Sequence, residues 1–135
     1  MLTLSDEVWL QMLGHAYDGL PDEACGLFAA PPGSALVARF YPCRNVAESS
    51  QVYTVDPKDH LRADRDAEDR GLEIVGVVHS HTHTDAYPSP TDVAQAPDPS
   101  WHYVIVSLRD LAPTLRSYRI VDGVIEEEPV ALLHG

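Results

Sequence analysis

Three histidines and one aspartate lie close together in a polar segment near the middle of the chain. His79, His81 and His83 are each separated by one residue, and Asp92 follows further along. Alternate residues of an extended chain point to the same side, so His79 and His81 can both reach one ion, and His83 could join them. Two imidazoles and a carboxylate suit a catalytic zinc site, which leaves a fourth position for water. The segment therefore predicts a zinc centre, although isolated His-x-His pairs also occur by chance.

The residues just before Asp92 also form a helix-start signal. Ser89 at the N-cap, Pro90 at the first helical position and Asp92 two residues later resemble a capping box. Capping alone would explain these residues. A helix start also turns its first side chains into an adjacent crevice, where a fixed Asp92 carboxylate could ligate zinc and a hydroxyl could polarise a substrate carbonyl. Capping and chemistry are therefore compatible.

A zinc site with three protein ligands also needs a general base for its water. The candidate is the acidic pair Asp22-Glu23, which precedes an apolar segment. Taken alone, the pair would be interpreted as a loop acid after Pro21. The residues themselves do not select Glu23 over Asp22.

The elements that must position these residues can be predicted from apolar runs and turn signals. An apolar run over 74–78 leads into the histidines and is typical of a buried strand, at whose carboxyl end open α/β sheets form crevices. Helices are expected to begin at Ser5, Asp56 and Ser89. Further strands are expected at 24–30, 35–41, 51–55, 101–108, 115–121 and 124–127. The pattern indicates an α/β fold with a mixed, mostly antiparallel sheet flanked by helices.

Length and charge narrow the class of protein. The 135 residues predict a single domain spanning 1–135, and the net charge of −12 argues against nucleic acid and anionic lipid as partners. No apolar run approaches a membrane span, and the acidic N-terminal segment is unlike a signal peptide, so a cytoplasmic protein is expected. Cys25 and Cys43 form no Cys-x-x-Cys pair and are expected to be buried. His15 is expected either at the surface or interacting with the dipole at the end of its helix, and His60 is expected to be exposed.

Taken in order, the candidate residues resemble the signature of the JAMM/MPN metalloprotease family. Glu23 precedes Ala24-Cys25-Gly26-Leu27-Phe28, and His79-x-His81 is followed after seven residues by Ser89 and after two more by Asp92. The resemblance covers about residues 20–110. It implies that His79, His81 and Asp92 bind one Zn²⁺ ion whose fourth ligand is the nucleophilic water. It also implies that Glu23 is the acid/base and that Ser89 stabilises the oxyanion.

The resemblance also bears on the substrate. Thr82 stands where many family members have proline, and with the Ala86-Tyr87-Pro88-Ser89 lead-in it is similar to a small bacterial branch of the family. Those enzymes cut newly made cysteine from the C-terminal glycine of a ubiquitin-like carrier. This implies a role in cysteine biosynthesis and a partner that is a ubiquitin-like sulfur carrier protein with a C-terminal Gly-Gly. The family spacing leaves His83 outside the ligand set, either behind the ligands or exposed.

Two other functions remain as alternatives. One is a non-catalytic MPN-type adaptor that binds a ubiquitin-like protein, with zinc structural or absent. The other is an amidohydrolase-type metal site, but such sites usually lie in a barrel of about 250 residues. The apolar C-terminal hairpin could support a homodimer or pack into the core.

Overall fold

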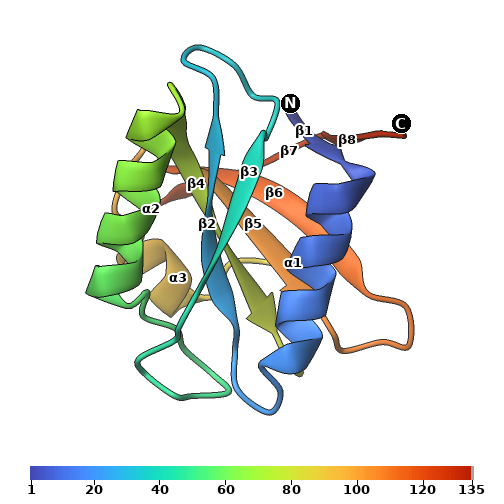
Figure 1. The fold of residues 1–135 in the computed structure, drawn as a ribbon. Coiled ribbons are helices and arrows are strands. Elements are labelled where there is room, and N and C mark those ends of the chain that lie inside the picture. Colours follow the sequence, from blue (N-terminus) through green and yellow to red (C-terminus); the bar gives the residue numbers. More distant parts are fainter. Residues whose placement is uncertain (135) are drawn as a thin grey trace.

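A mixed sheet forms the centre of the fold. The computed structural model describes residues 1–134, and within them six strands pair in the order β3-β2-β4-β5-β6-β7 (Figure 1). Neighbouring strands run antiparallel, apart from the parallel pair β4–β5. The predicted mixed, mostly antiparallel sheet is confirmed. The strands are β2 Cys25–Ala30, β3 Arg39–Cys43, β4 Glu73–His81, β5 His102–Ser107, β6 Thr114–Val121 and β7 Val124–Glu128.

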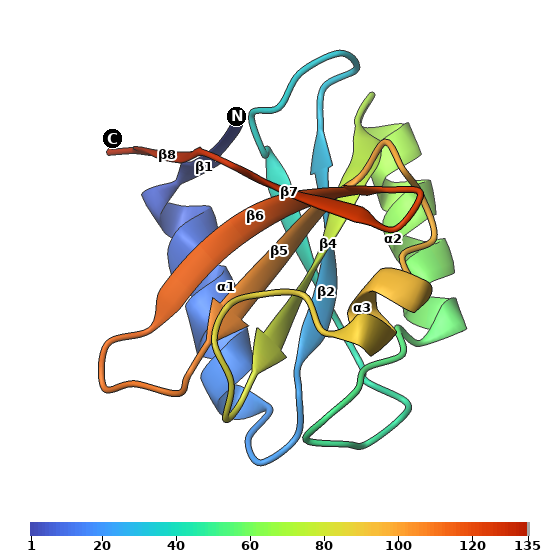
Figure 2. The same ribbon diagram turned by 180° about the vertical axis from the view of Figure 1, so that it is seen from behind.

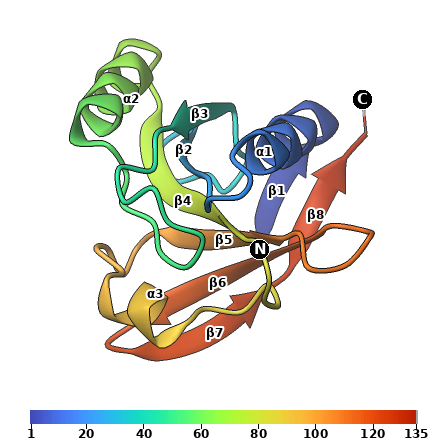
Figure 3. The same ribbon diagram turned by 90° about the horizontal axis from the view of Figure 1, so that it is seen from below.

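Three helices cover the sheet in the described part of the chain, and each begins at its predicted cap. They are α1 Asp6–Asp18, α2 Pro57–Asp69 and α3 Pro90–Ala94. The side chains of Ser5, Asp56 and Ser89 each accept a hydrogen bond from a backbone N–H in the first turn of their helix. Figure 3 shows α1 on one side of the sheet and α2 and α3 on the other.

The two faces of the sheet carry separate parts of the core, as alternation along a strand requires. On the α1 side, Met12 packs with Phe28 and Val104. On the other side, Ala63 of α2 packs with Val77 and Ile105. β4 and β5 therefore have buried side chains on both faces, which holds the end of β4 rigidly.

A glycine allows the close contact between β4 and its neighbours. A Cβ atom on Gly76 would lie 2.3 Å from the Phe28 ring and 2.3 Å from the carbonyl oxygen of His102. Neither neighbour can move freely, because Phe28 is fully buried and His102 belongs to the adjacent strand. The strand that carries the histidines therefore has no room for a side chain at this position.

A second, two-stranded sheet was not predicted. β1 Leu2–Ser5 pairs in parallel with β8 Val130–Leu133 and brings the two ends of the chain together (Figure 1). Leu2 and Leu4 are fully buried against the α1 face of the sheet. Within residues 1–134, no helix combines the length and the apolar character that crossing a bilayer requires.

Two strand predictions need correction. The strand expected at 35–41 lies at Arg39–Cys43, and the segment before it joins β1 through a single bridge between Thr3 and Leu36. The prediction of a strand at 51–55 is wrong. This segment is an irregular loop held by Asn45, whose Oδ1 accepts the N–H of Thr54 at 3.0 Å. A side chain that takes the backbone donor competes with strand pairing.

His15 lies in the last turn of α1, as expected, but its side chain is not at the surface. It is half-buried, and its Nε2 lies 2.8 Å from the carbonyl oxygen of Cys25 and 3.2 Å from that of Cys43. His15 therefore anchors α1 to β2 and β3 and is not a surface residue. Both cysteines are buried, as predicted.

Candidate metal centre

The end of β4 and the start of α3 bring three metal-binding side chains together. His79 and His81 are buried at the carboxyl end of β4, and their Nε2 atoms are 3.1 Å apart. The loop after β4 returns to α3 (Figure 2), whose first turn places Asp92 Oδ2 at 3.2 Å from His79 Nε2 and 3.1 Å from His81 Nε2. The ligand atoms of the three residues lie within 4.8 Å of one another.

Hydrogen bonds hold two of these side chains in a fixed orientation. His81 Nδ1 lies 2.7 Å from the carbonyl oxygen of Asp85, so Nδ1 carries the proton and the Nε2 lone pair faces the cluster. The capping box predicted at α3 is present: Asp92 Oδ2 accepts the N–H of Ser89 at 2.9 Å, and Ser89 Oγ accepts the N–H of Asp92 at 3.0 Å. The helix start therefore orients Asp92 for ligation.

The electrostatics of the three residues favour cation binding. Burial lowers the pKa of His79, which keeps its imidazole neutral. Burial also opposes ionisation of Asp92, but hydrogen bonds with His79 and His81 outweigh it and hold the Asp92 pKa below its usual range. At His81, the Asp92 and Asp85 contacts outweigh burial and raise the pKa. An ionised carboxylate beside a neutral imidazole is the state that binds a metal, and binding must displace a proton from His81 when it is charged.

The donor atoms match what zinc requires. Tetrahedral coordination at about 2.0–2.1 Å separates ligand atoms by about 3.3 Å, close to the separations among these three groups. The two imidazoles and one carboxylate form a three-ligand set of the catalytic kind, which leaves one coordination position for water or substrate. The structure brings together all three of the ligands that the sequence predicts.

Glu23 is buried beside this cluster. Ala24 exchanges two hydrogen bonds with Ser80: its N–H donates to Ser80 Oγ at 2.8 Å, and its carbonyl accepts the Ser80 N–H at 2.9 Å. These bonds place Glu23 next to the His-Ser-His segment. Glu23 Oε1 has no hydrogen-bond partner among residues 1–134.

The surroundings of Glu23 determine its charge. Burial raises the pKa of Glu23 to about 7, and the positive charge of His81 partly opposes this. A buried carboxyl with an unpaired oxygen is poised to accept or give a proton. Asp22 is only half-buried, so Glu23 is the more enclosed of the two acids that the residues alone left open.

The other residues singled out in the sequence also lie near the cluster. Ser89 is half-buried, and because its Oγ accepts from Asp92, its own proton is free for donation. Thr82 is buried and donates to the carbonyl oxygen of Ser50 at 3.2 Å, which ties the end of β4 to the 45–55 loop. His83 is exposed and lies outside the three-residue donor group.

Tyr53 is a site residue that the sequence did not reveal. Its ring stacks on His79 with centroids 4.2 Å apart and an angle of 21° between the planes. Burial raises the pKa of Tyr53 above its usual range, so the phenol stays neutral. The strand-like pattern at 51–55 hid this role, because the segment is a loop that folds over the site.

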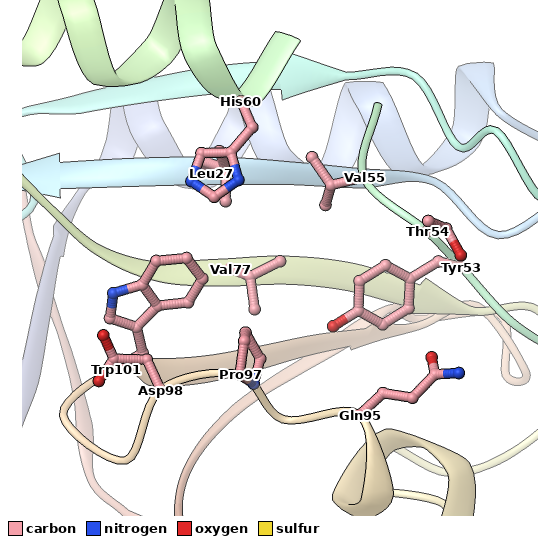
Figure 4. A pocket seen from close by; sticks show the side chains of 10 residues that line it. All are labelled: Leu27, Tyr53, Thr54, Val55, His60, Val77, Gln95, Pro97, Asp98 and Trp101. Atoms are coloured by element: carbon pink, nitrogen blue, oxygen red, sulfur yellow. The ribbon is translucent and has the colours of Figure 1, made fainter. Parts of the chain in front are cut away.

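An apolar cavity of about 460 Å³ adjoins the site through Tyr53. Figure 4 shows the rings of Tyr53 and Trp101 at opposite ends of it, with Val77 and Pro97 between them. His60, expected at the surface, is half-buried and lines this cavity, 6.0 Å from Trp101 between ring centroids. The remaining lining residues are Leu27, Thr54, Val55, Gln95 and Asp98.

The chain is similar to known proteins over most of its length. Residues 5–121 match the family described as prokaryotic homologs of the JAB domain. The CysO-cysteine peptidase of Mycobacterium tuberculosis is 48% identical over 120 residues, covering 88% of this chain and 82% of the relative.

Two solved structures show the same architecture. A protein from Desulfitobacterium hafniense superposes with a TM-score of 0.92 at 36% identity, over 100% of this chain and 94% of its own. A JAB1/MPN domain protein from Archaeoglobus fulgidus superposes with a TM-score of 0.67 at 18% identity, over 98% of this chain and 99% of its own. At this identity the likeness shows the fold alone. The chain therefore belongs to the family of prokaryotic homologs of the JAB domain and is a hydrolase of the JAMM type.

Proposed function

We propose that this chain is a zinc-dependent peptidase that hydrolyses the amide bond after the C-terminal glycine of a ubiquitin-like sulfur carrier protein and releases cysteine. The observation that carries the proposal is the meeting of His79, His81 and Asp92 beside the buried, unpaired carboxyl of Glu23. A purely structural metal site would have no use for an unpaired acid at its edge, since burying an unpaired polar group is unfavourable.

The residues have distinct roles in this reaction. When bound, zinc supplies a Lewis acid that polarises the scissile carbonyl and lowers the pKa of water. Glu23 takes a proton from the attacking water and delivers it to the leaving nitrogen as the C–N bond breaks. Burial favours the protonated form of Glu23, which helps the carboxyl to hold the proton between the two steps.

Ser89 stabilises the charge that develops on the carbonyl oxygen. Its Oγ is held by the N–H of Asp92, which leaves the hydroxyl proton available to the substrate. A donor held in place before the reaction is effective because no reorganisation is needed when the charge forms. The capping box therefore places one ligand and one donor at the same helix start.

The apolar cavity is suited to the carrier's tail. Its walls reach His79 through the stacked Tyr53 and extend to Trp101 (Figure 4). A Gly-Gly segment has no side chains, so its backbone can come close to the ligands. The name of the M. tuberculosis relative, a CysO-cysteine peptidase, supports an amide to cysteine as the bond that is cut.

The test uses a purified ubiquitin-like carrier that ends in Gly-Gly-Cys. Incubation with the zinc-loaded protein is expected to shorten the carrier by one cysteine residue, measured by intact mass, and a chelator is expected to stop the reaction. A zinc-loaded protein that binds the carrier without releasing cysteine would favour the adaptor function and contradict the proposal.

A further inference from the structure

A second cavity reaches the metal centre from a different direction. It has a volume of about 410 Å³, and among the described residues it shares none of its lining with the apolar cavity. It contacts the site through His81 and Ser89, whereas the apolar cavity reaches it through Tyr53. The other lining residues are His83, Thr84, Asp85, Tyr87 and Arg109.

Arg109 brings a permanent positive charge to this second cavity, and the end of β5 holds its backbone beside β4. The N–H of Leu108 donates to the carbonyl oxygen of His81 at 2.9 Å. Ser107 Oγ donates to the carbonyl oxygen of Thr84 at 2.5 Å and accepts the N–H of Arg109 at 3.3 Å. These hydrogen bonds therefore hold the backbone of Arg109 close to His81, one of the three candidate metal ligands.

The guanidinium of Arg109 has a partner that a ligand can replace. Arg109 Nη1 lies 2.6 Å from Asp85 Oδ1, but the two side chains are 52% and 74% exposed. Exposed ion pairs contribute about 0–1 kcal/mol, so exchange of the Asp85 carboxylate for another carboxylate has little cost. The planar fork of arginine also matches a carboxylate in a bidentate manner.

Hydrolysis of an amide gives two products that leave from different sides of the broken bond. If the carrier's tail occupies the apolar cavity, the amine product faces the other cavity. The chain carries 21 acidic residues against nine lysines and arginines, so an anionic leaving group needs a local cation. Arg109 is placed to supply it.

We propose that the second cavity binds the leaving residue and that Arg109 pairs with its free α-carboxylate. This rests on the proposed function and deepens it: the protein removes a single C-terminal residue and discriminates against substrates whose chain continues or whose carboxylate is masked. Asp85 occupies the guanidinium until the substrate carboxylate replaces it.

The experiment compares two synthetic peptides that end in Gly-Gly-Cys, one with a free carboxylate and one with a C-terminal amide. For the zinc-loaded protein, kcat/KM is expected to be about 2- to 5-fold higher for the acid, mainly through KM, as for a partly exposed ion pair. Arg109→Ala is expected to lower kcat/KM for the acid to the level for the amide, so that the preference for the free carboxylate is lost. The preference of Arg109→Lys for the acid should lie between those of wild type and Arg109→Ala, because lysine keeps the charge but lacks the planar fork of arginine.

Arg70→Ala is the matched control. Arg70 is 47% exposed and forms a similarly short pair, with Nε 2.7 Å from Asp66 Oδ2, but it does not line the cavity. The Arg70→Ala variant should therefore keep the wild-type preference for the acid over the amide. Equal cleavage of acid and amide by the wild type, or equal loss for both in Arg109→Ala, overturns the assignment while the proposed peptidase stands. If the protein cleaves neither the two peptides nor the full carrier, the proposed function and this inference are both overturned.

Discussion

Replacing Glu23 with glutamine tests whether a buried, proton-exchanging carboxyl lies beside the metal site. Glu23 is 4% exposed, and burial raises its pKa from 4.5 to about 7. In the metal-free protein, the folded state then binds a proton more tightly than the unfolded state. The Glu23 contribution therefore makes the folded protein less stable as pH rises from about 4.5 to about 7, and it is constant above that range.

The magnitude follows from the size of the shift. One pKa unit corresponds to about 1.4 kcal/mol, so a shift of about 2.5 units gives at most about 3 kcal/mol. Glutamine has the same shape as glutamate but cannot ionise, so the Glu23→Gln variant does not lose this stability as pH rises. We expect the unfolding free energy of the variant, relative to that of wild type, to increase by about 1 to 3 kcal/mol as pH rises from about 4.5 to about 8.

Urea denaturation of chelator-treated protein across this pH range measures the effect. Asp22→Asn is the matched control, because it removes the same charge from the neighbouring residue, which is half-buried. The gain specific to Glu23 is the difference between the two variants. A Glu23→Gln stability difference that is the same at pH 5 and pH 8 would refute the account of a buried, protonated Glu23.

Three further changes probe the site. His79→Ala or Asp92→Ala should lose both zinc, measured by elemental analysis, and hydrolysis, whereas persistent stoichiometric zinc would contradict their role as ligands. Ser80→Ala leaves the buried N–H of Ala24 without its acceptor, so unfolding free energy from urea denaturation should fall by about 1–3 kcal/mol and kcat should drop with zinc retained. Ser89→Ala removes the cap and the proposed donor. It should lower kcat about 10²- to 10³-fold, and an unchanged kcat with intact fold would exclude Ser89 as the donor.

The parts of the site that are local in sequence could be predicted from it. The two-residue spacing of His79 and His81 sets their shared side of β4, and the Ser89–Asp92 spacing sets the cap of α3. The choice of Glu23 over Asp22 could not be made from the residues, because it depends on hydrogen bonds between Ala24 and a strand far along the chain. The family resemblance supplied what local patterns lacked.

The remaining differences arise from long-range contacts. Val52, Tyr53 and Val55 are residue types that favour strands. However, Asn45 takes the N–H of Thr54 and Tyr53 stacks on His79, so the segment folds over the site. The β1–β8 pair joins opposite ends of the chain, and strands of four residues give too short a pattern to detect. Identity of the metal, the substrate and the catalytic roles stay predictions.

The central claim is a metal-dependent hydrolysis in which Glu23 moves the proton. The most direct measurement compares wild type and Glu23→Gln on a carrier ending in Gly-Gly-Cys, after elemental analysis shows one zinc in each. We predict that Glu23→Gln retains zinc and releases cysteine at least about 100-fold more slowly, the usual contribution of a general acid/base. Equal rates of cysteine release from the two fully metallated proteins would contradict the account.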